Sequence, residues 1–250
     1  MSDEQVPERD GIEEGQLVMP FYLICDVSYS MVGDMTDLNA GLRRLHQAIV
    51  MQPVVDDVAQ ICIMSFSDQA KVLLPLGQMS EAAIPTLSVE GGTDYGSAFR
   101  ELAQTVERDR AALKANGYKI YRPCVFFLTD GAPNDRSWHQ TFTSTLTYDR
   151  QTGQGMKSHP IFVPFGFRDA PESVMQQLAY PPERSKWYLA RKNNVEDALT
   201  GMLDVIMKTV VTSARTARSS QPAVTQQAPA AGSGITQGNS AYDPDWVDED

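Results

Sequence analysis

Short apolar segments alternate along this sequence with segments whose apolar residues recur at helical spacing. The apolar segments, each expected to form a strand, cover residues 19–26, 58–66, 71–76, 122–130, 160–167 and 186–190. Helices are expected after a cap at Thr36 or Asp37 and over residues 95–115, 137–146, 171–179 and 194–214. This alternation predicts a doubly wound α/β domain with a mostly parallel sheet. A four-residue polar link before residues 71–76 predicts that this strand is an antiparallel edge strand.

The negative charge of the chain is concentrated at its two ends. The 250 residues carry a net charge of −11, of which residues 1–15 account for −5 and residues 218–250 for −4. The near-neutral section between them is long enough for one well-buried domain, and it does not suggest the basic stripe that nucleic acids bind. We therefore predict an acidic disordered tail over residues 1–15, one domain over residues 16–217, and no nucleic-acid partner.

Residues 218–250 have the composition of a disordered linker with an acidic end. Ser, Gln, Pro, Ala and Gly dominate the segment, which has too little apolar surface to offset the entropy of ordering. The end, "AYDPDWVDED", allows several roles. It could increase solubility, dock elsewhere on the domain through Trp246, or bring a carboxylate to a metal site of the same chain or of a neighbouring copy.

The cysteines indicate a reducing compartment, and the lengths of the apolar runs indicate that the chain does not span a membrane. Cys25, Cys62 and Cys124 lie in different apolar segments without a partner at metal-ligand spacing, which favours buried reduced thiols. The N-terminal residues lack the features of a signal peptide, and no run reaches the roughly 18 apolar residues of a membrane span. A cytoplasmic protein without a membrane span is the expectation.

Two predicted strands end in an aspartate, Asp26 after "FYLIC" and Asp130 after "VFFLT". The carboxyl ends of parallel strands share one edge of a sheet, where ligands bind at the reversal of strand order. Two carboxylates there would repel each other without a cation. An extended backbone also directs Asp26, Ser28 and Ser30 to one side. Such an oxygen-only set is typical of a site for a hard cation such as Mg²⁺.

These residues carry a family resemblance. "DVSYS" resembles the DxSxS signature that opens the metal-ion-dependent adhesion site of von Willebrand factor A domains. "EGGTDYG" supplies the Thr of that pattern as Thr93, and "FFLTDGAPND" supplies its strand-end Asp as Asp130. The resemblance covers about residues 17–213. Through "GGTDYGSAF" and "YRPCVFFLTDGAPND", the chain also resembles the TerY-like proteins of bacterial tellurium-resistance and stress-response clusters.

The resemblance implies a role for each residue. Ser28, Ser30 and, in the high-affinity arrangement, Thr93 would bind Mg²⁺ or Mn²⁺ directly, while Asp26 and Asp130 would act through water or accept hydrogen bonds from the hydroxyls. The ion would then attract an Asp or Glu carboxylate of a protein partner, which is adhesion and not catalysis. The TerY-like resemblance implies an assembly subunit for phospho-signalling, with a PP2C-type phosphatase and a Ser/Thr kinase as partners.

Other interpretations of the same residues stay open. Asp26 or Asp130 could belong to an ordinary turn, and Ser28 and Ser30 could bond local backbone. Thr93 could cap the following helix. A Mg²⁺-dependent aspartate-nucleophile phosphohydrolase also places an Asp after its first strand, but it needs a second carboxylate where this chain has Ser28. A scaffold with a vestigial metal site is the third alternative.

Overall fold

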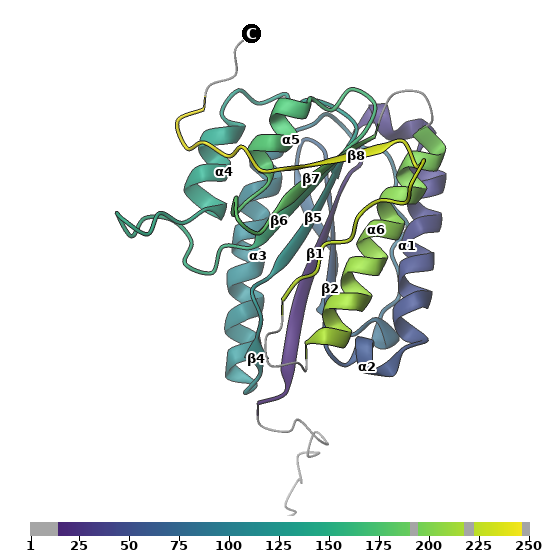
Figure 1. The fold of residues 1–250 in the computed structure, drawn as a ribbon, viewed down its shortest axis with the longest axis vertical. Coiled ribbons are helices and arrows are strands. Elements are labelled where there is room, and N and C mark those ends of the chain that lie inside the picture. The colour runs from purple at the N-terminus through teal and green to yellow at the C-terminus, as the bar shows by residue number, and fades with distance from the viewer. Residues whose placement is uncertain (1–14, 191–194, 218–222, 247–250) are drawn as a thin grey trace, which may run out of the picture.

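A computed structural model describes residues 15–190, 195–217 and 223–246 of the chain. Within these residues an eight-stranded sheet lies between two layers of helices (Figure 1). The strands are β1 (Leu17–Asp26), β2 (Ala59–Phe66), β3 (Ala70–Gly77), β4 (Lys119–Ile120), β5 (Cys124–Thr129), β6 (Ile161–Gly166), β7 (Lys186–Ala190) and β8 (Ile235–Asn239). The helices are α1 (Met35–Val50), α2 (Pro53–Asp56), α3 (Tyr95–Ala115), α4 (Trp138–Leu146), α5 (Glu172–Leu178) and α6 (Val195–Thr216).

The strand order is β3-β2-β1-β5-β6-β7-β8, with the short β4 paired to β1. β1 is parallel to both β2 and β5, whereas β3 is antiparallel to β2 at one edge. The chain moves outward from β1 in one direction to β2 and in the other to β5, so the strand order reverses beside β1. The predicted doubly wound, mostly parallel sheet with an antiparallel edge strand is confirmed. The antiparallel pairing of β8 with β7 at the other edge was not predicted.

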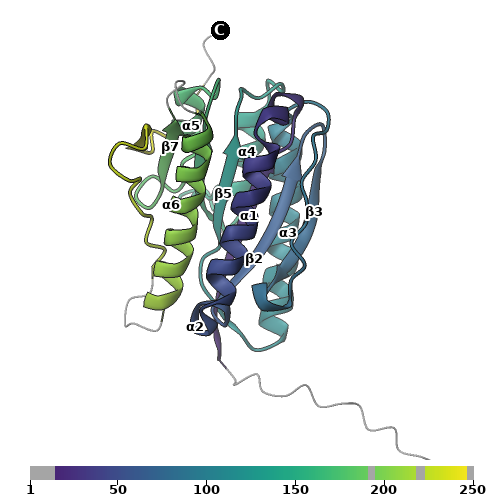
Figure 2. The same ribbon diagram turned by 90° about the vertical axis from the view of Figure 1, so that its right-hand side faces the viewer.

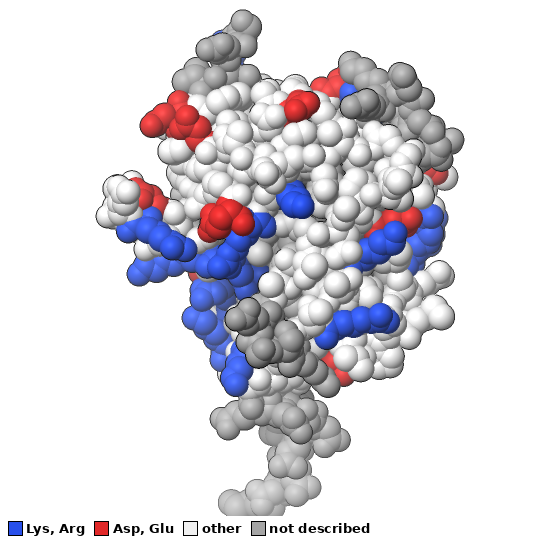
Figure 3. All heavy atoms as spheres, in the orientation of Figure 1, with Lys and Arg blue, Asp and Glu red and all other residues white. Residues whose placement is uncertain are grey.

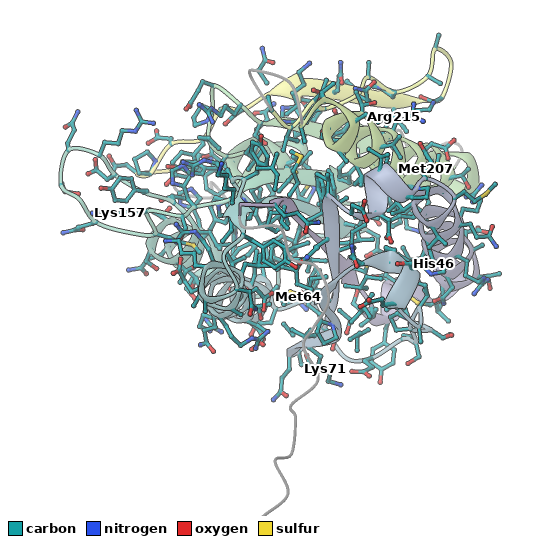
Figure 4. The ribbon with its side chains drawn as sticks, turned by 90° about the horizontal axis from the view of Figure 1, so that it is seen from below. His46, Met64, Lys71, Lys157, Met207 and Arg215 are labelled. Carbon is teal, nitrogen blue, oxygen red and sulfur yellow. The ribbon has the colours of Figure 1, made fainter. Side chains whose placement is uncertain are left out.

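Helices on the two faces bury two separate apolar clusters. α1 and α6 cover one face, and α3, α4 and α5 cover the other (Figure 2). Because successive strand residues point to opposite faces, Leu23 and Cys25 pack under α1 and α6 while Tyr22 and Ile24 pack under α3. Seen from below, side chains fill both spaces, with Met64 in the interior and Lys71, Lys157 and Arg215 at the periphery (Figure 4).

The three cysteines are free and buried, as predicted. Cys25 and Cys124 belong to the cluster under α1 and α6, and Cys62 belongs to the opposite cluster. Burial raises the pKa of Cys62 to about 12, so its thiol stays protonated near neutral pH. These residues therefore serve as small apolar side chains of the core.

The start of α1 differs from the prediction. The helix begins at Met35 with Asp34 as its N-cap residue, and not at a cap formed by Thr36 or Asp37. A short 3-10 helix, Tyr29–Gly33, precedes it and advances the helical start. The Asp34 carboxylate makes no capping hydrogen bond, since both of its oxygens accept hydrogen bonds from Arg168.

The C-terminal segment contradicts the predicted disorder over the part that the structure describes. Residues 223–246 lie along the domain, and Ile235–Asn239 form the edge strand β8. Composition did not indicate this strand because backbone hydrogen bonds to β7, and not a run of apolar side chains, fix it in place. The predicted acidic tail over residues 1–15 lies almost wholly outside the described residues, as do residues 247–250.

The surface carries charges of both signs. On the face drawn in Figure 3, Lys and Arg side chains gather toward the lower left and acidic side chains are scattered. Burial, with Arg184 and Arg150 nearby, lowers the pKa of Arg122, so three guanidinium groups share one neighbourhood. The expected absence of a nucleic-acid partner stays a prediction. In the described part of the chain, no helix is both long and apolar enough to cross a bilayer.

The buried His159 gives a prediction about stability and pH. Burial, followed by the charge of Arg122, lowers the pKa of His159 to about 4. An unfolded chain protonates this histidine near pH 6.5, so folding stability is lost as the pH falls from about 6.5 toward 4. We expect His159→Gln to lose less unfolding free energy than wild type over this range, measured by urea denaturation. His46→Gln, on α1, is the matched control; equal pH dependence in wild type and His159→Gln would contradict the assignment.

Candidate metal site

The ends of β1 and β5 place two aspartates side by side. The strands are parallel neighbours, with Cys25 opposite Leu128, so Asp26 ends β1 where Asp130 follows β5. This edge of the sheet lies opposite β4 and α2 (Figure 1). The predicted adjacency of the two strand ends is thus present in the fold, and it depends on nothing more than parallel pairing.

Hydrogen bonds connect four of the five predicted site residues. The Ser28 backbone N–H donates to Asp26 Oδ1 over 2.9 Å, and the hydroxyls of Ser28 and Ser30 are 3.0 Å apart. Ser30 Oγ donates to Asp130 Oδ1 over 2.8 Å. The route to Ser30 differs from the predicted one: extended backbone continues only as far as Ser28, and the 3-10 helix that follows brings Ser30 back to Asp130.

Thr93 is held beside this network through its backbone. Its carbonyl accepts a hydrogen bond of 2.9 Å from the Asn134 N–H, which joins it to the loop after Asp130. Tyr29 N donates to Gly91 O over 3.2 Å, which ties the loop before Thr93 to the loop after β1. Among the described residues, the Thr93 hydroxyl joins no hydrogen bond. The structure therefore places Thr93 between the two loops without linking its side chain to the other four residues.

The two carboxylates are buried and incompletely satisfied. Asp26 is 0% exposed and Asp130 is 2% exposed. Asp130 Oδ2 has no hydrogen-bond partner in the part of the chain that the structure describes. Burial raises the pKa of Asp26 to about 6, opposed by hydrogen bonds from Ser28 and Thr129, and burial also raises the pKa of Asp130. The site thus contains negative charge that the described protein atoms do not fully compensate.

Two residues that the sequence analysis did not assign support Asp26 from below. Thr129 Oγ1 donates to Asp26 Oδ2 over 2.8 Å. Tyr95 Oη in turn donates to Thr129 Oγ1 over 3.0 Å and to the Gly131 carbonyl over 2.8 Å. Both residues stand inside the quoted motifs, Thr129 in "TDG" and Tyr95 in "TDYG", but their role depends on side-chain contacts between distant segments.

An ion pair adjoins the site. Arg168 follows β6 with a φ of 54°, and its Nε and Nη2 each donate to Asp34 over 2.8 Å. The Arg168 charge also lowers the pKa of Asp130 and so partly opposes the effect of burial. The hydrogen bonds and charge of Asp34, together with the charge of Asp130, raise the pKa of Arg168, so its guanidinium interacts with both carboxylates. Arg168 compensates the site from one side only.

The donor set fits a hard divalent cation. It consists of the hydroxyls of Ser28 and Ser30 with the unpartnered oxygen of Asp130, and it contains no nitrogen or sulfur. In the described residues, no group of three or more His, Cys, Asp or Glu side chains is placed to hold a metal. Zinc sites are usually built from such nitrogen and sulfur ligands, whereas Mg²⁺ takes oxygen ligands and keeps several waters.

The residues of this site lie within a match to a known family. Residues 21–132 match the family described as von Willebrand factor type A domain, so this part of the chain is similar to domains of that class. None of the curated proteins matches the sequence.

Solved structures share the fold. The open conformation of the pilus adhesin SpaC from Lactobacillus rhamnosus GG has a TM-score of 0.55 at 15% identity, over 78% of this chain and 30% of that chain. The ArnB paralog VWA2 from Sulfolobus acidocaldarius has a TM-score of 0.52 at 15% identity, over 78% of this chain and 46% of that chain. A mutant of the PilB minor pilin from Streptococcus sanguinis has a TM-score of 0.52 at 14% identity, over 84% of this chain and 65% of that chain. This chain thus spans less than half of the first two, and the likeness concerns the fold.

The unpartnered Asp130 oxygen gives a prediction about stability without metal. In EDTA at pH 8, Asp130→Asn should raise the unfolding free energy by about 1 kcal/mol, because it removes a buried charge that lacks a partner. A carboxyl group whose pKa rises on folding disfavours the folded state most above that pKa, so the gain should shrink toward pH 4. Asp34→Asn, which weakens the ion pair with Arg168, should lower stability instead. Urea denaturation measures both, and a loss of stability in Asp130→Asn at pH 8 would contradict the charge imbalance.

Proposed function

We propose that this domain is a non-enzymatic, Mg²⁺-dependent protein interaction module that uses a metal-ion-dependent adhesion site. The observation that carries the proposal is the hydrogen-bonded cluster of Asp26, Ser28, Ser30 and Asp130 with one unpartnered buried carboxylate oxygen. A purely local role for these residues would leave that oxygen unexplained, since buried polar atoms are normally satisfied.

Each residue has a part in holding the ion. The hydroxyls of Ser28 and Ser30 and that of Thr93 are the proposed direct ligands, and Asp26 and Asp130 orient them as hydrogen-bond acceptors or act through water. Thr129 and Tyr95 fix the Asp26 carboxylate from below. When bound, Mg²⁺ or Mn²⁺ would supply a positive charge that attracts a carboxylate from outside the domain.

The surroundings of the site favour a protein as the ligand. Tyr29 and Val32, each 73% exposed, belong to the same 3-10 helix as the exposed Ser30. Large apolar side chains of this kind next to a polar centre are typical of protein interfaces. We infer that a partner places an Asp or Glu on the ion and covers Tyr29 and Val32 with apolar surface.

The TerY-like resemblance leads to a narrower proposal. The segments "GGTDYGSAF" and "YRPCVFFLTDGAPND" support a cytoplasmic assembly subunit of a bacterial stress-response or tellurium-resistance system. In that setting the partners would be a PP2C-type phosphatase and a Ser/Thr kinase.

The phosphohydrolase alternative is disfavoured by the position of Asp26. This carboxylate is 0% exposed, and both of its oxygens accept hydrogen bonds, from Ser28 N and Thr129 Oγ1. A nucleophile needs an accessible oxygen, and the second carboxylate that would serve as general acid is replaced by Ser28. A measurement of metal affinity distinguishes our proposal from a scaffold with a vestigial site, because the vestigial site would not bind the ion.

Metal binding is the first test of the proposed function. Wild type should bind Mg²⁺ or Mn²⁺ in isothermal titration calorimetry, and Asp26→Ala should weaken the affinity by at least about tenfold while the domain stays folded. Asp26→Asn keeps the side-chain shape and should have the same effect. Asp57→Ala removes an exposed carboxylate after α2, at the opposite end of the sheet, and should bind like wild type. Equal metal affinity in wild type and the three variants would contradict the proposed metal site.

Hydrolysis assays are the second test. The purified protein with Mg²⁺ should not hydrolyse para-nitrophenyl phosphate or ATP above the rate without protein, because Asp26 is enclosed and Ser28 cannot act as a carboxylic acid. If the protein does hydrolyse one of these substrates and Asp26→Asn abolishes the activity, the result would contradict the interaction module and support the phosphohydrolase.

A further inference from the structure

The C-terminal strap, residues 235–246, lies in a groove on the domain whose walls contain none of the predicted metal ligands. β8 begins the strap along β7, and its end reaches α4 (Figure 1). We call the surface beneath it the strap groove; β7, α4, α5 and Tyr180 form its walls. The strap differs from a core strand, since four of the five β8 residues are only half-buried and the last is exposed.

Backbone atoms of the strap are recognised along most of its length. β8 pairs with β7 over five residues, from Ala190 opposite Ile235 to Lys186 opposite Asn239. Beyond β8, the buried amide of Gln177 continues the recognition: its Nε2 donates to the Ala241 carbonyl, and its Oε1 accepts from Asp243 N, each over 2.8 Å. This combination of an added strand and a side-chain clamp is the way in which sheet edges bind extended peptides.

Three positions of the strap, each four residues apart, fit side-chain contacts of the groove. Gly238 lies on the indole of Trp187, where a Cβ atom would overlap the ring. Tyr242 packs on Tyr180 with ring centroids 5.0 Å apart, and its hydroxyl donates to Thr143 Oγ1. Trp246 lies 5.4 Å from the ring of Trp138. The strap therefore carries a pattern of Gly, then Tyr, then Trp at intervals of four.

The attachment of the strap to the domain permits exchange. Residues 217–234 connect α6 to β8. Within them, Thr225 N and Gln227 N donate to Ser213 and Thr209 of α6, so residues 228–234 form the connection that opens when the strap is exchanged. The strap buries less apolar surface than the core strands, so its opening should require less free energy than unfolding of the domain. An opened strap would leave the edge of β7 unpaired, and an unpaired edge accepts another strand.

We propose that the strap groove is a peptide-binding site, filled by the chain's own residues 235–246 and, by exchange, by the same segment of a second copy. The incoming peptide pairs with β7, places Gly on Trp187 and inserts Tyr and Trp against Tyr180 and Trp138. Exchange of an identical element between two copies preserves every contact, so it joins them at little cost in free energy. This interaction needs no metal ion, and it stands independently of the proposed adhesion site.

The test uses the full chain and a labelled synthetic peptide of residues 233–250, in EDTA. Gly238→Val should displace the strap, because its side chain overlaps Trp187. The peptide, which keeps Gly238, should then bind this variant at least about tenfold more tightly than it binds wild type, whose tethered strap competes. The full chain with Tyr242→Ala and Trp246→Ala is a second displaced variant that leaves β8 intact. Thr236→Val, within β8, is the matched control and should behave like wild type.

Tryptophan emission reports release of the strap, since all three tryptophans of the chain, Trp138, Trp187 and Trp246, belong to the groove or the strap. A peptide carrying Tyr242→Ala and Trp246→Ala should bind weakly to every protein. Emission is read in Gly238→Val, which keeps all three tryptophans. The proposal is overturned if this variant does not bind the intact peptide although its emission has changed, or if the altered peptide binds equally well.

The second copy is tested by warming a mixture of two wild-type proteins that carry different tags. Mixed dimers should appear in size-exclusion chromatography and should be suppressed by excess peptide, in EDTA as in Mg²⁺. Peptide binding without any mixed dimer would overturn the second copy as the occupant.

Discussion

The parallel pairing of β1 with β5 is the constraint on which the rest of the structure depends. It aligns two strands that each end in an aspartate, and it buries both carboxylates at one edge of the sheet. Burial of two like charges is unfavourable, so the neighbouring loops must supply hydroxyls and a guanidinium to offset it. The Ser28–Ser30 turn, Thr129 and Arg168 fulfil this need in part, and the remaining unpartnered oxygen of Asp130 is the feature from which the proposed function follows.

The loops at this edge are held together mainly through backbone atoms. Val27 accepts from Glu90 N, Ser67 accepts from Asp94 N, and the Asp135 carboxylate accepts from the first amides of α3. Backbone contacts of this kind fix the positions of the loops, so the side chains of Ser30 and Thr93 do not have to hold the loops together. A pre-positioned site with the exposed Ser30 above buried carboxylates suits a partner that arrives with its own carboxylate.

The strap groove and the candidate metal site meet in the aromatic cluster between them. Trp246 packs on Trp138, Trp138 packs edge-on against Tyr95, and the Tyr95 hydroxyl reaches Thr129 beneath Asp26. These contacts make the floor of one site part of the wall of the other. Both sites lie at borders of the same sheet. The candidate metal site lies at the carboxyl ends of β1 and β5, and the strap groove lies along the side where β8 pairs with β7.

The sequence by itself determined the alternating strands and helices, since apolar periodicity is a local property. The aspartates that end two apolar segments also predicted that Asp26 and Asp130 meet, because the carboxyl ends of neighbouring parallel strands share one edge of a sheet. Tertiary structure alone decided the 3-10 turn that returns Ser30, the support from Tyr95 and Arg168, and the docking of residues 235–246. Those features depend on hydrogen bonds and ring contacts between residues far apart in the chain, for which composition and periodicity carry no signal.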